Sequence, residues 1–156
     1  MLFPRYVYLL IAMAGLTAAS AMAQTATTVT RSATLPAIGL ASSETAQVNV
    51  TNLAANTTGG TAASCTGSIS FLSPAGATIG TATSFTVTSG QTFSAKLPYS
   101  ATAASGRTVV RGVVSLTLTS GTPCALATTL ETYDTSTGVT HVFFVGSEVD
   151  LGRFGR

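Results

Sequence analysis

Charged side chains are scarce in this sequence: seven Lys and Arg and five Asp and Glu occur in 156 residues. Because the positive and negative side chains nearly balance, we expect no strongly positive surface that would bind nucleic acid or an anionic membrane. Tryptophan is absent and there is one histidine. A four-ligand zinc site built on several histidines, or a calcium loop rich in Asp, therefore has too few ligands. We expect no nucleic-acid partner, no metal and no cofactor.

Long apolar runs are also missing, apart from the one near the start of the chain. Residues 1–23 combine a positive start at Arg5, an uncharged apolar run and a small-x-small ending at Ala21 and Ala23. This pattern is typical of a secretory signal peptide, and the run is shorter than the roughly 20 residues of a membrane-spanning helix. We expect cleavage before Gln24, a secreted or periplasmic protein, and no membrane span after cleavage.

Cysteine is present only as one pair, Cys65 and Cys124, which are 59 positions apart. There is no CxxC motif, and the single histidine cannot complete a zinc site. An even pair in an oxidising compartment indicates a disulfide, which for so long a loop stabilises the fold by ~4 kcal/mol in the chain-entropy model.

From Glu44 onward, short runs with a period of two alternate with turn signals, as in "ETAQVNVTN", "CTGSISFLS" and "QTFSAKLP". No helical periodicity interrupts them. The pattern predicts an all-β fold, an antiparallel immunoglobulin-like β-sandwich of about seven to eight strands with one disulfide; a jelly roll or a partly closed barrel is the alternative. We expect the sandwich to occupy 42–146, after a lead-in at 24–41 that is a first strand or a flexible segment, and before a loose tail at 147–156.

Residues 107–119 and 124–134 fit an antiparallel hairpin. In one register Leu116 lies opposite Leu126 on an apolar face, and Arg111 lies opposite Glu131 on the other face. Because one register gives both an apolar face and a charge pair, we expect Arg111 and Glu131 to form a structural pair.

The segment "DTSTG" that follows predicts a hairpin turn, since Asp134 can bond its own backbone and Gly138 can adopt a positive φ. The returning strand "VTHVFFV" is apolar on both faces. It is therefore either a central strand covered on both sides or one that exposes a hydrophobic row. His141 falls beside Thr132, or beside Tyr133 if Gly138 forms a bulge.

Sequence motifs of catalysis are absent: there is no GxSxG, HExxH, Walker loop or dinucleotide fingerprint. We interpret His141 as an ordinary strand histidine. A glycosidase needs two carboxyl groups across a cleft. The acidic residues are expected in separate places, with Glu131 beside Arg111, Asp134 in its turn and two others in the tail, so they do not form such a pair. We expect no catalytic residues and predict a non-enzymatic protein.

The runs "SETAQVNVTNLA", "CTGSISFLSPAGATIG", "FTVTSGQTFSAKLP", "RTVVRGVV" and "CALATTLETYDTSTGVTHVF" together resemble a group of small, secreted bacterial proteins of immunoglobulin-like build and unknown function. The resemblance covers residues 38–145 and consists of strand-and-turn features plus the two cysteines. It implies an architecture and brings no catalytic residues with it. It also implies a bacterial source, in which the sequons at Asn49 and Asn56 carry no meaning.

These observations favour an exported protein that acts through its surface, as an envelope, matrix or adhesion-type interaction protein whose partner is a protein or a glycan. An exposed edge strand or the loops at 53–64 and 98–106 would provide the contacts. The alternative is a carbohydrate-binding module that uses exposed aromatic rings; the candidate contact residues are Tyr99, Tyr133 and Phe144. A third hypothesis is a small secreted hydrolase that uses His141.

Overall fold

The computed structural model describes residues 27–55, 63–119 and 124–146. The expected signal peptide, the C-terminal tail and the sequon at Asn56 lie outside these residues. The described residues form one short 3-10 helix, η1 (Tyr99–Thr102), and nine strands. The strands are β1 (Thr28–Thr34), β2 (Ile38–Leu40), β3 (Glu44–Asn52), β4 (Ser64–Leu72), β5 (Thr78–Thr88), β6 (Thr92–Pro98), β7 (Thr108–Thr119), β8 (Leu126–Asp134) and β9 (Thr140–Val145).

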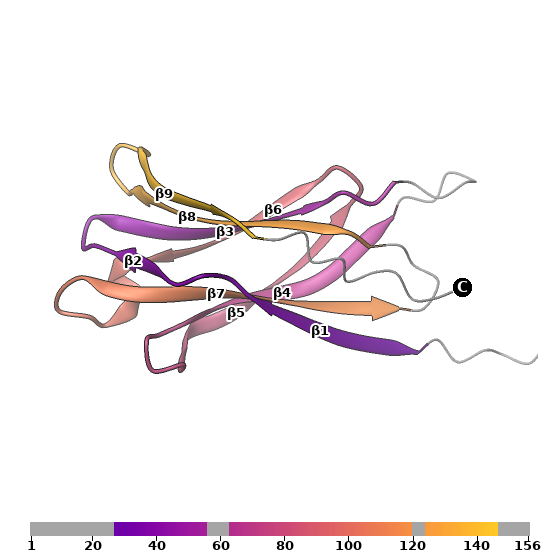
Figure 1. Cartoon of the computed structure of the whole chain (residues 1–156), viewed down its shortest axis with the longest axis horizontal. Coiled ribbons are helices and arrows are strands. Elements are labelled where there is room, and N and C mark those ends of the chain that lie inside the picture. The colour runs from indigo at the N-terminus through magenta and orange to yellow at the C-terminus, as the bar shows by residue number, and fades with distance from the viewer. Residues whose placement is uncertain (1–26, 56–62, 120–123, 147–156) are drawn as a thin grey trace, which may run out of the picture.

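The strands form two antiparallel sheets that lie one above the other (Figure 1). One sheet has the order β1-β7-β4-β5, with β2 also paired to β7, and the other has the order β6-β3-β8-β9. The all-β sandwich is confirmed, and the two sheets do not close into a barrel. Nine strands are present instead of seven to eight because the lead-in segment contributes both β1 and β2.

The core lies between the sheets and follows the predicted alternation. On β3, the side chains of Ala46, Val48 and Val50 are buried, while the intervening residues face outward and are only partly covered. The same period of two runs along β7 and β8. Period-2 burial of this kind is what one covered face of an antiparallel sheet requires. No helix among the described residues is long and apolar enough to cross a membrane.

The predicted pairing of β7 with β8 is wrong. Strand β7 pairs with β1, β2 and β4, while β8 pairs with β3 and β9 in the other sheet. Leu116 and Leu126 are both buried as expected, but in different sheets. Two strands that face each other across a core bury alternate residues just as two neighbours in one sheet do. Alternation alone therefore could not distinguish these arrangements.

The structural pair of Arg111 and Glu131 is wrong for the same reason. Arg111 lies opposite Leu72 of β4 on the outer face of one sheet. Glu131 lies on the outer face of the other sheet, where its Oε1 accepts hydrogen bonds from Gln47 Nε2 at 2.9 Å and from Asn49 Nδ2 at 3.1 Å. The core separates the two outer faces, so the guanidinium group and the carboxylate do not meet.

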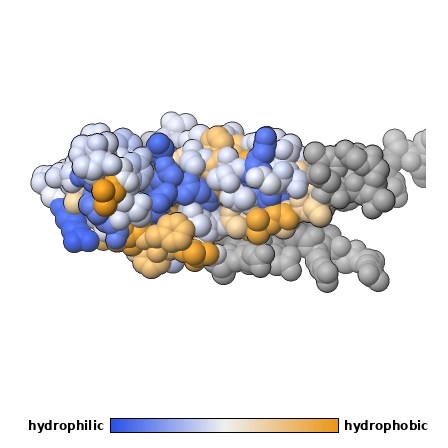
Figure 2. Space-filling model, turned by 90° about the horizontal axis from the view of Figure 1, so that it is seen from above, coloured by the Kyte–Doolittle hydropathy of each residue, from blue (hydrophilic) through white to orange (hydrophobic). Residues whose placement is uncertain are grey.

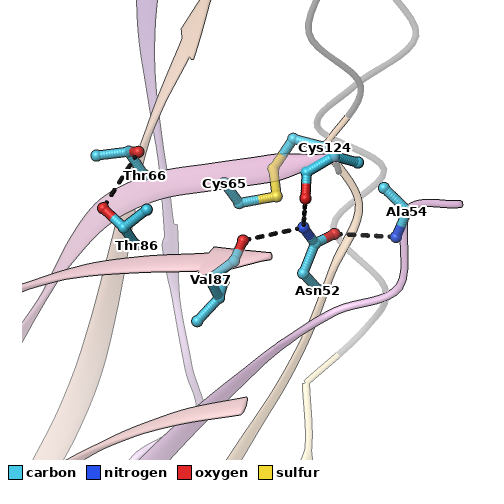
Figure 3. The surroundings of a disulfide bond; sticks show 8 residues. Asn52, Ala54, Cys65, Thr66, Thr86, Val87 and Cys124 are labelled. Atoms are coloured by element: carbon cyan, nitrogen blue, oxygen red, sulfur yellow. Dashed lines mark hydrogen bonds between the residues drawn. A yellow bond between two sulfur atoms is a disulfide. The ribbon is translucent and has the colours of Figure 1, made fainter. Parts of the chain in front are cut away.

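The predicted disulfide is confirmed. Cys65 at the start of β4 is bonded to Cys124 just before β8, so the bond joins the two sheets at one end of the sandwich (Figure 3). Beside it, the fully buried Asn52 ends β3. Its Nδ2 donates to the carbonyl oxygens of Ala63 and Val87, each at 3.1 Å, and its Oδ1 accepts from the backbone N–H of Ala54 at 2.9 Å. This amide therefore links β3 to the strands of the other sheet.

Candidate functional site: the Glu44–His141 pair and the β9 edge

The turn between β8 and β9 is built as predicted. Asp134 N donates to Val139 O at 2.9 Å, Gly138 N donates to Asp134 O at 2.9 Å, and Gly138 has a φ of 74°. The Asp134 carboxylate accepts hydrogen bonds from the hydroxyl and backbone N–H groups of both Ser136 and Thr137. The hydroxyl of Ser136 contributes most to lowering the pKa of Asp134, followed by the bonds from Thr137. The ionised side chain thus fixes the turn.

The hairpin contains a bulge, which places His141. Tyr133 pairs with Thr140 and Thr132 pairs with Val142, so that His141 is the extra residue between two pairs. It therefore has neither of the neighbours expected from the sequence as its direct partner. A bulge residue is aimed differently from its neighbours on a regular strand.

The bulge directs His141 toward Glu44, the first residue of β3. The distance from His141 Nδ1 to Glu44 Oε1 is 2.6 Å, and Glu44 Oε2 accepts a hydrogen bond from Ala41 N at 2.6 Å. Burial alone would raise the pKa of Glu44. The hydrogen bonds from His141 and Ala41, and the positive charges of His141 and Arg107, outweigh this effect and lower that pKa.

The Glu44–His141 pair joins a half-exposed imidazole to a mostly buried carboxylate. The His141 side chain is 43% exposed and that of Glu44 is 11% exposed. A carboxylate on Nδ1 orients an imidazole as a general base requires, but a nucleophilic triad also needs a hydroxyl on Nε2. Within the described residues, no hydroxyl group is bonded to His141, and no three His, Cys, Asp or Glu side chains gather as a metal site would.

The Glu44–His141 pair is better described as a clamp. It attaches the β8–β9 hairpin to the start of β3, 97 positions away in the sequence. Two further bonds act at the same place: Thr135 N donates to Ser43 O at 2.8 Å, and the hydroxyl groups of Thr45 and Thr135 lie 2.8 Å apart. The sequence carries no signal for this pairing, because it depends on how β3 aligns with β8 and on the one-residue bulge.

A hollow of about 310 Å³ lies at the other end of the sandwich, beside the disulfide. Of the described residues, six line it, and four of these carry a hydroxyl group while none is ionisable; they are Ser64, Thr66, Thr117, Leu118, Thr119 and Cys124. The Glu44–His141 pair does not open into it, so the two features do not form a common site.

Strand β9 is an edge strand with an apolar surface. It pairs with β8, and no other described strand lies on its far side. Phe143 is 54% exposed, Val145 71% and Phe144 38%. Figure 2 looks down on this sheet and shows apolar surface gathered along one rim of the face. Of the two alternatives that the sequence left open for this strand, the exposed hydrophobic row is correct.

The other edges of the two sheets are less apolar. On β6, Lys96 and Pro98 are exposed, and both residue types oppose further strand pairing. Strand β5 is mostly threonine, alanine and glycine over its exposed half, where Gly80 has a φ of 68° and the register with β4 shifts. Strand β1 combines hydroxyl side chains with Arg31. Among the described strands, the part of β9 beyond its bulge at His141 is thus the edge with the least protection.

Tyr99, one of the candidate contact residues, is occupied by an internal role. Its hydroxyl group donates to Ala104 O at 2.9 Å and lies 2.8 Å from Gly106 O, and its ring packs partly against the core. It therefore holds the loop that follows η1 and does not present a free ring.

Tyr133 and Phe144 point to opposite sides of their sheet. Tyr133 lies on the outer face, where Lys96 Nζ is 5.8 Å from the ring centre. Phe144 pairs with the buried Leu130 and belongs to the inner row. The aromatic residue that shares the outer face with Tyr133 is Phe143, which pairs with Glu131. The three candidate residues consequently do not form one platform.

The described residues thus offer two features with functional potential, the clamp of Glu44 and His141 and the apolar edge of β9. The clamp is one point of attachment for the hairpin that carries this edge. No family model matches the chain, and neither does any curated protein or solved structure.

Proposed function

We propose that this chain is an exported, non-enzymatic β-sandwich protein that acts through its surface, as an envelope, matrix or adhesion-type interaction protein, and that β9 is the strand that meets the partner. The observation that carries the proposal is the exposure of Phe143 and Val145 on the part of the edge beyond His141, which has no charge or proline to block pairing. The partner is an extended protein segment of apolar character.

Edge strands present unpaired N–H and C=O groups, which template the addition of another strand. Natural proteins protect such edges with lysine, proline or bulges. In this chain the protection is placed on β6, through Lys96 and Pro98, and not on the apolar part of β9. An edge that binds an added strand has to remain unprotected, which explains this asymmetry. In such a complex the main-chain hydrogen bonds provide affinity and alternate side chains provide specificity.

Export is supported by the signal-peptide pattern of residues 1–23 and by the paired cysteines. The sparse charge suits a protein whose solubility depends on Ser and Thr. The resemblance to small secreted bacterial proteins of immunoglobulin-like build agrees with a secreted or periplasmic location. These features support the export of the protein.

The experiment uses the mature chain from Gln24 as bait on the native envelope fraction. Wild type, Phe143→Lys and the control Thr81→Lys, which places the same charge on exposed β5, are compared. We expect wild type and Thr81→Lys to retain the same partner and Phe143→Lys to lose it. Equal recovery with all three baits, or no recovery above background with wild type, would contradict the proposal.

A second candidate is a carbohydrate-binding module on the outer face of the same sheet. Tyr133 and Phe143 there flank Glu131, which is joined to Gln47 and Asn49 by hydrogen bonds. Aromatic rings beside amide and carboxylate groups suit a sugar ring. This function requires glycan binding that is lost in Tyr133→Ala and kept in Phe144→Ala, because Phe144 belongs to the inner row. Binding by neither wild type nor variant on a glycan array would exclude it for the glycans tested.

A further inference from the structure

The main chain of β9 shows which residues face the open edge. Gly146 N donates to Thr128 O at 2.8 Å, so the main-chain groups of Gly146 point toward β8. In an antiparallel pair the direction alternates from residue to residue. Phe144 and Val142 therefore also point toward β8, whereas Phe143 and Val145 present their N–H and C=O groups to the open edge.

These two residues can pair with themselves in a second copy. A two-fold axis normal to the sheet keeps outer side chains on the outer face, so an outer residue must meet an outer residue. One register satisfies this condition and gives hydrogen bonds to Phe143 and Val145 of both copies. In this register Phe143 of each copy lies opposite Val145 of the other. Phe144 then lies opposite its own counterpart at the axis.

The side chains suit this register. Phe143 and Val145 form aromatic and β-branched cross-strand pairs, which stabilise sheets. Residues 142–145 carry no charge, so the association of two copies opposes no like charges within this stretch. Moving the register so that Phe143 meets its own counterpart would set Val145 opposite the bulged His141, whose side chain is held by Glu44. The first register is therefore preferred.

We propose that a second copy of this chain binds β9 edge to edge, and that the two β6-β3-β8-β9 sheets join into one continuous sheet of eight strands. This inference rests on the proposed function, since it names the partner of the same edge. The partner is a second copy because the edge of β9 accepts an uncharged apolar strand, and residues 142–145 of another copy are such a strand. The contact is short, so the dimer is weak and its population depends on protein concentration.

The first test measures molar mass by sedimentation velocity over a series of concentrations of the mature chain. We expect wild type and Thr81→Lys to shift from monomer to dimer as the concentration rises. Val145→Lys, at an exposed position, should remain folded by circular dichroism and raise the dimer Kd by at least about tenfold. A monomer at every concentration, or dimers unaffected by Val145→Lys, would overturn the inference.

The second test fixes the register. Phe144→Cys sets two thiols opposite each other at the axis, so mild oxidation should produce a covalent dimer from this variant. Val142→Cys, which lies opposite Gly146 of the second copy, should produce little. A dimer that cross-links through Val142→Cys and not through Phe144→Cys refutes the register. If wild type is monomeric yet still captures an envelope protein through Phe143, the proposed function stands and the self-association fails.

Discussion

The two ends of β3 are held in different ways. At one end the fully buried Asn52 uses its amide for three hydrogen bonds beside the Cys65–Cys124 disulfide (Figure 3). At the other end Glu44 binds the half-exposed His141, and the nearby turn at Asp134 is open to solvent. One end of β3 is thus buried beside a covalent link between the sheets, and the other end is held by polar contacts that water can reach.

This difference should set the order in which the sandwich loosens. Hydrogen bonds in a low-dielectric interior are strong and costly to leave unmade, whereas ion pairs in contact with water contribute little. We therefore expect the end near Asn52 to hold the two sheets together. The end near Glu44 carries the turn of the β8–β9 hairpin and is the softer of the two. Strand β9 runs from this turn to the middle of the sheet, where Phe144 pairs with Leu130 and Leu130 with Val48.

Of the changes at the two ends, removal of the disulfide should lower the free energy of unfolding most. The variant Cys65→Ala with Cys124→Ala should lose ~4 kcal/mol of unfolding free energy, because the unfolded chain is no longer constrained. Urea unfolding followed by circular dichroism measures the loss, and reduced wild type serves as a control for the cavity left by the two sulfurs. A loss comparable to that of a surface substitution would show that the disulfide is not the main stabilising contact at the Asn52 end of the sandwich.

Asn52→Ala should come next, with a loss of about 3 kcal/mol, because it removes three buried hydrogen bonds and leaves the N–H of Ala54 without its partner, although the carbonyl of Ala63 keeps its bond from Ser89 N. Asn49→Ala is the matched control, since Asn49 lies on the outer face of the same strand and bonds to exposed or half-buried groups. We expect the control to lose less than about 1 kcal/mol. Equal losses for both variants would mean that burial does not distinguish the two asparagines.

Much of the fold could be predicted from the sequence, and the reason is local. The period of two along β3 and β8 predicted that alternate residues are buried, and the turn chemistry of Asp134 and Gly138 located the hairpin. These features depend on neighbours in the chain. The disulfide was predictable because two cysteines allow a single pairing.

Lateral pairing and the candidate site could not be predicted in the same way. The alternation of Leu116 and Leu126 fits facing strands as well as adjacent ones, which produced the wrong pairing of Arg111 with Glu131. The contact between His141 and Glu44 depends on a bulge, and one residue more or less on a strand reverses the direction of every side chain beyond it. Asn52 gave no signal, since a polar residue at a strand end usually indicates a turn.

A substitution at the softer end should increase stability. The hydroxyl of Thr132 on β8 is buried, and no described residue bonds to it. Thr132→Val keeps the shape and removes the unpaired polar group, so we expect a gain of about 1 kcal/mol. Thr129→Val is the control, because Thr129 accepts a hydrogen bond from Asn49 on the outer face. A loss of stability in Thr132→Val would show that its hydroxyl group has a partner after all.

Glu44→Gln should lower stability at neutral pH by no more than about 1 kcal/mol, since His141 is nearly half exposed. The folded pKa of Glu44 is lowered below its ordinary value of 4.5. Its contribution is therefore complete above that value and disappears as the pH falls through the lower, folded pKa. Urea unfolding of wild type and variant should differ at pH 7 and converge in acid. A difference that grows toward low pH would contradict the lowered pKa.

The smallest effect on global unfolding is expected from Asp134→Ala, because the bonds that its carboxylate accepts from Ser136 and Thr137 lie in a solvent-exposed turn. The loss should instead be local, since the turn sets the register of β9. We expect faster amide hydrogen exchange along β9 and unchanged exchange around Asn52, and Asp134→Asn, which can still accept from the turn, should restore most of the protection. Faster exchange at both ends would mean that the hairpin and the disulfide end open together, and that the two ends of β3 do not differ in stability.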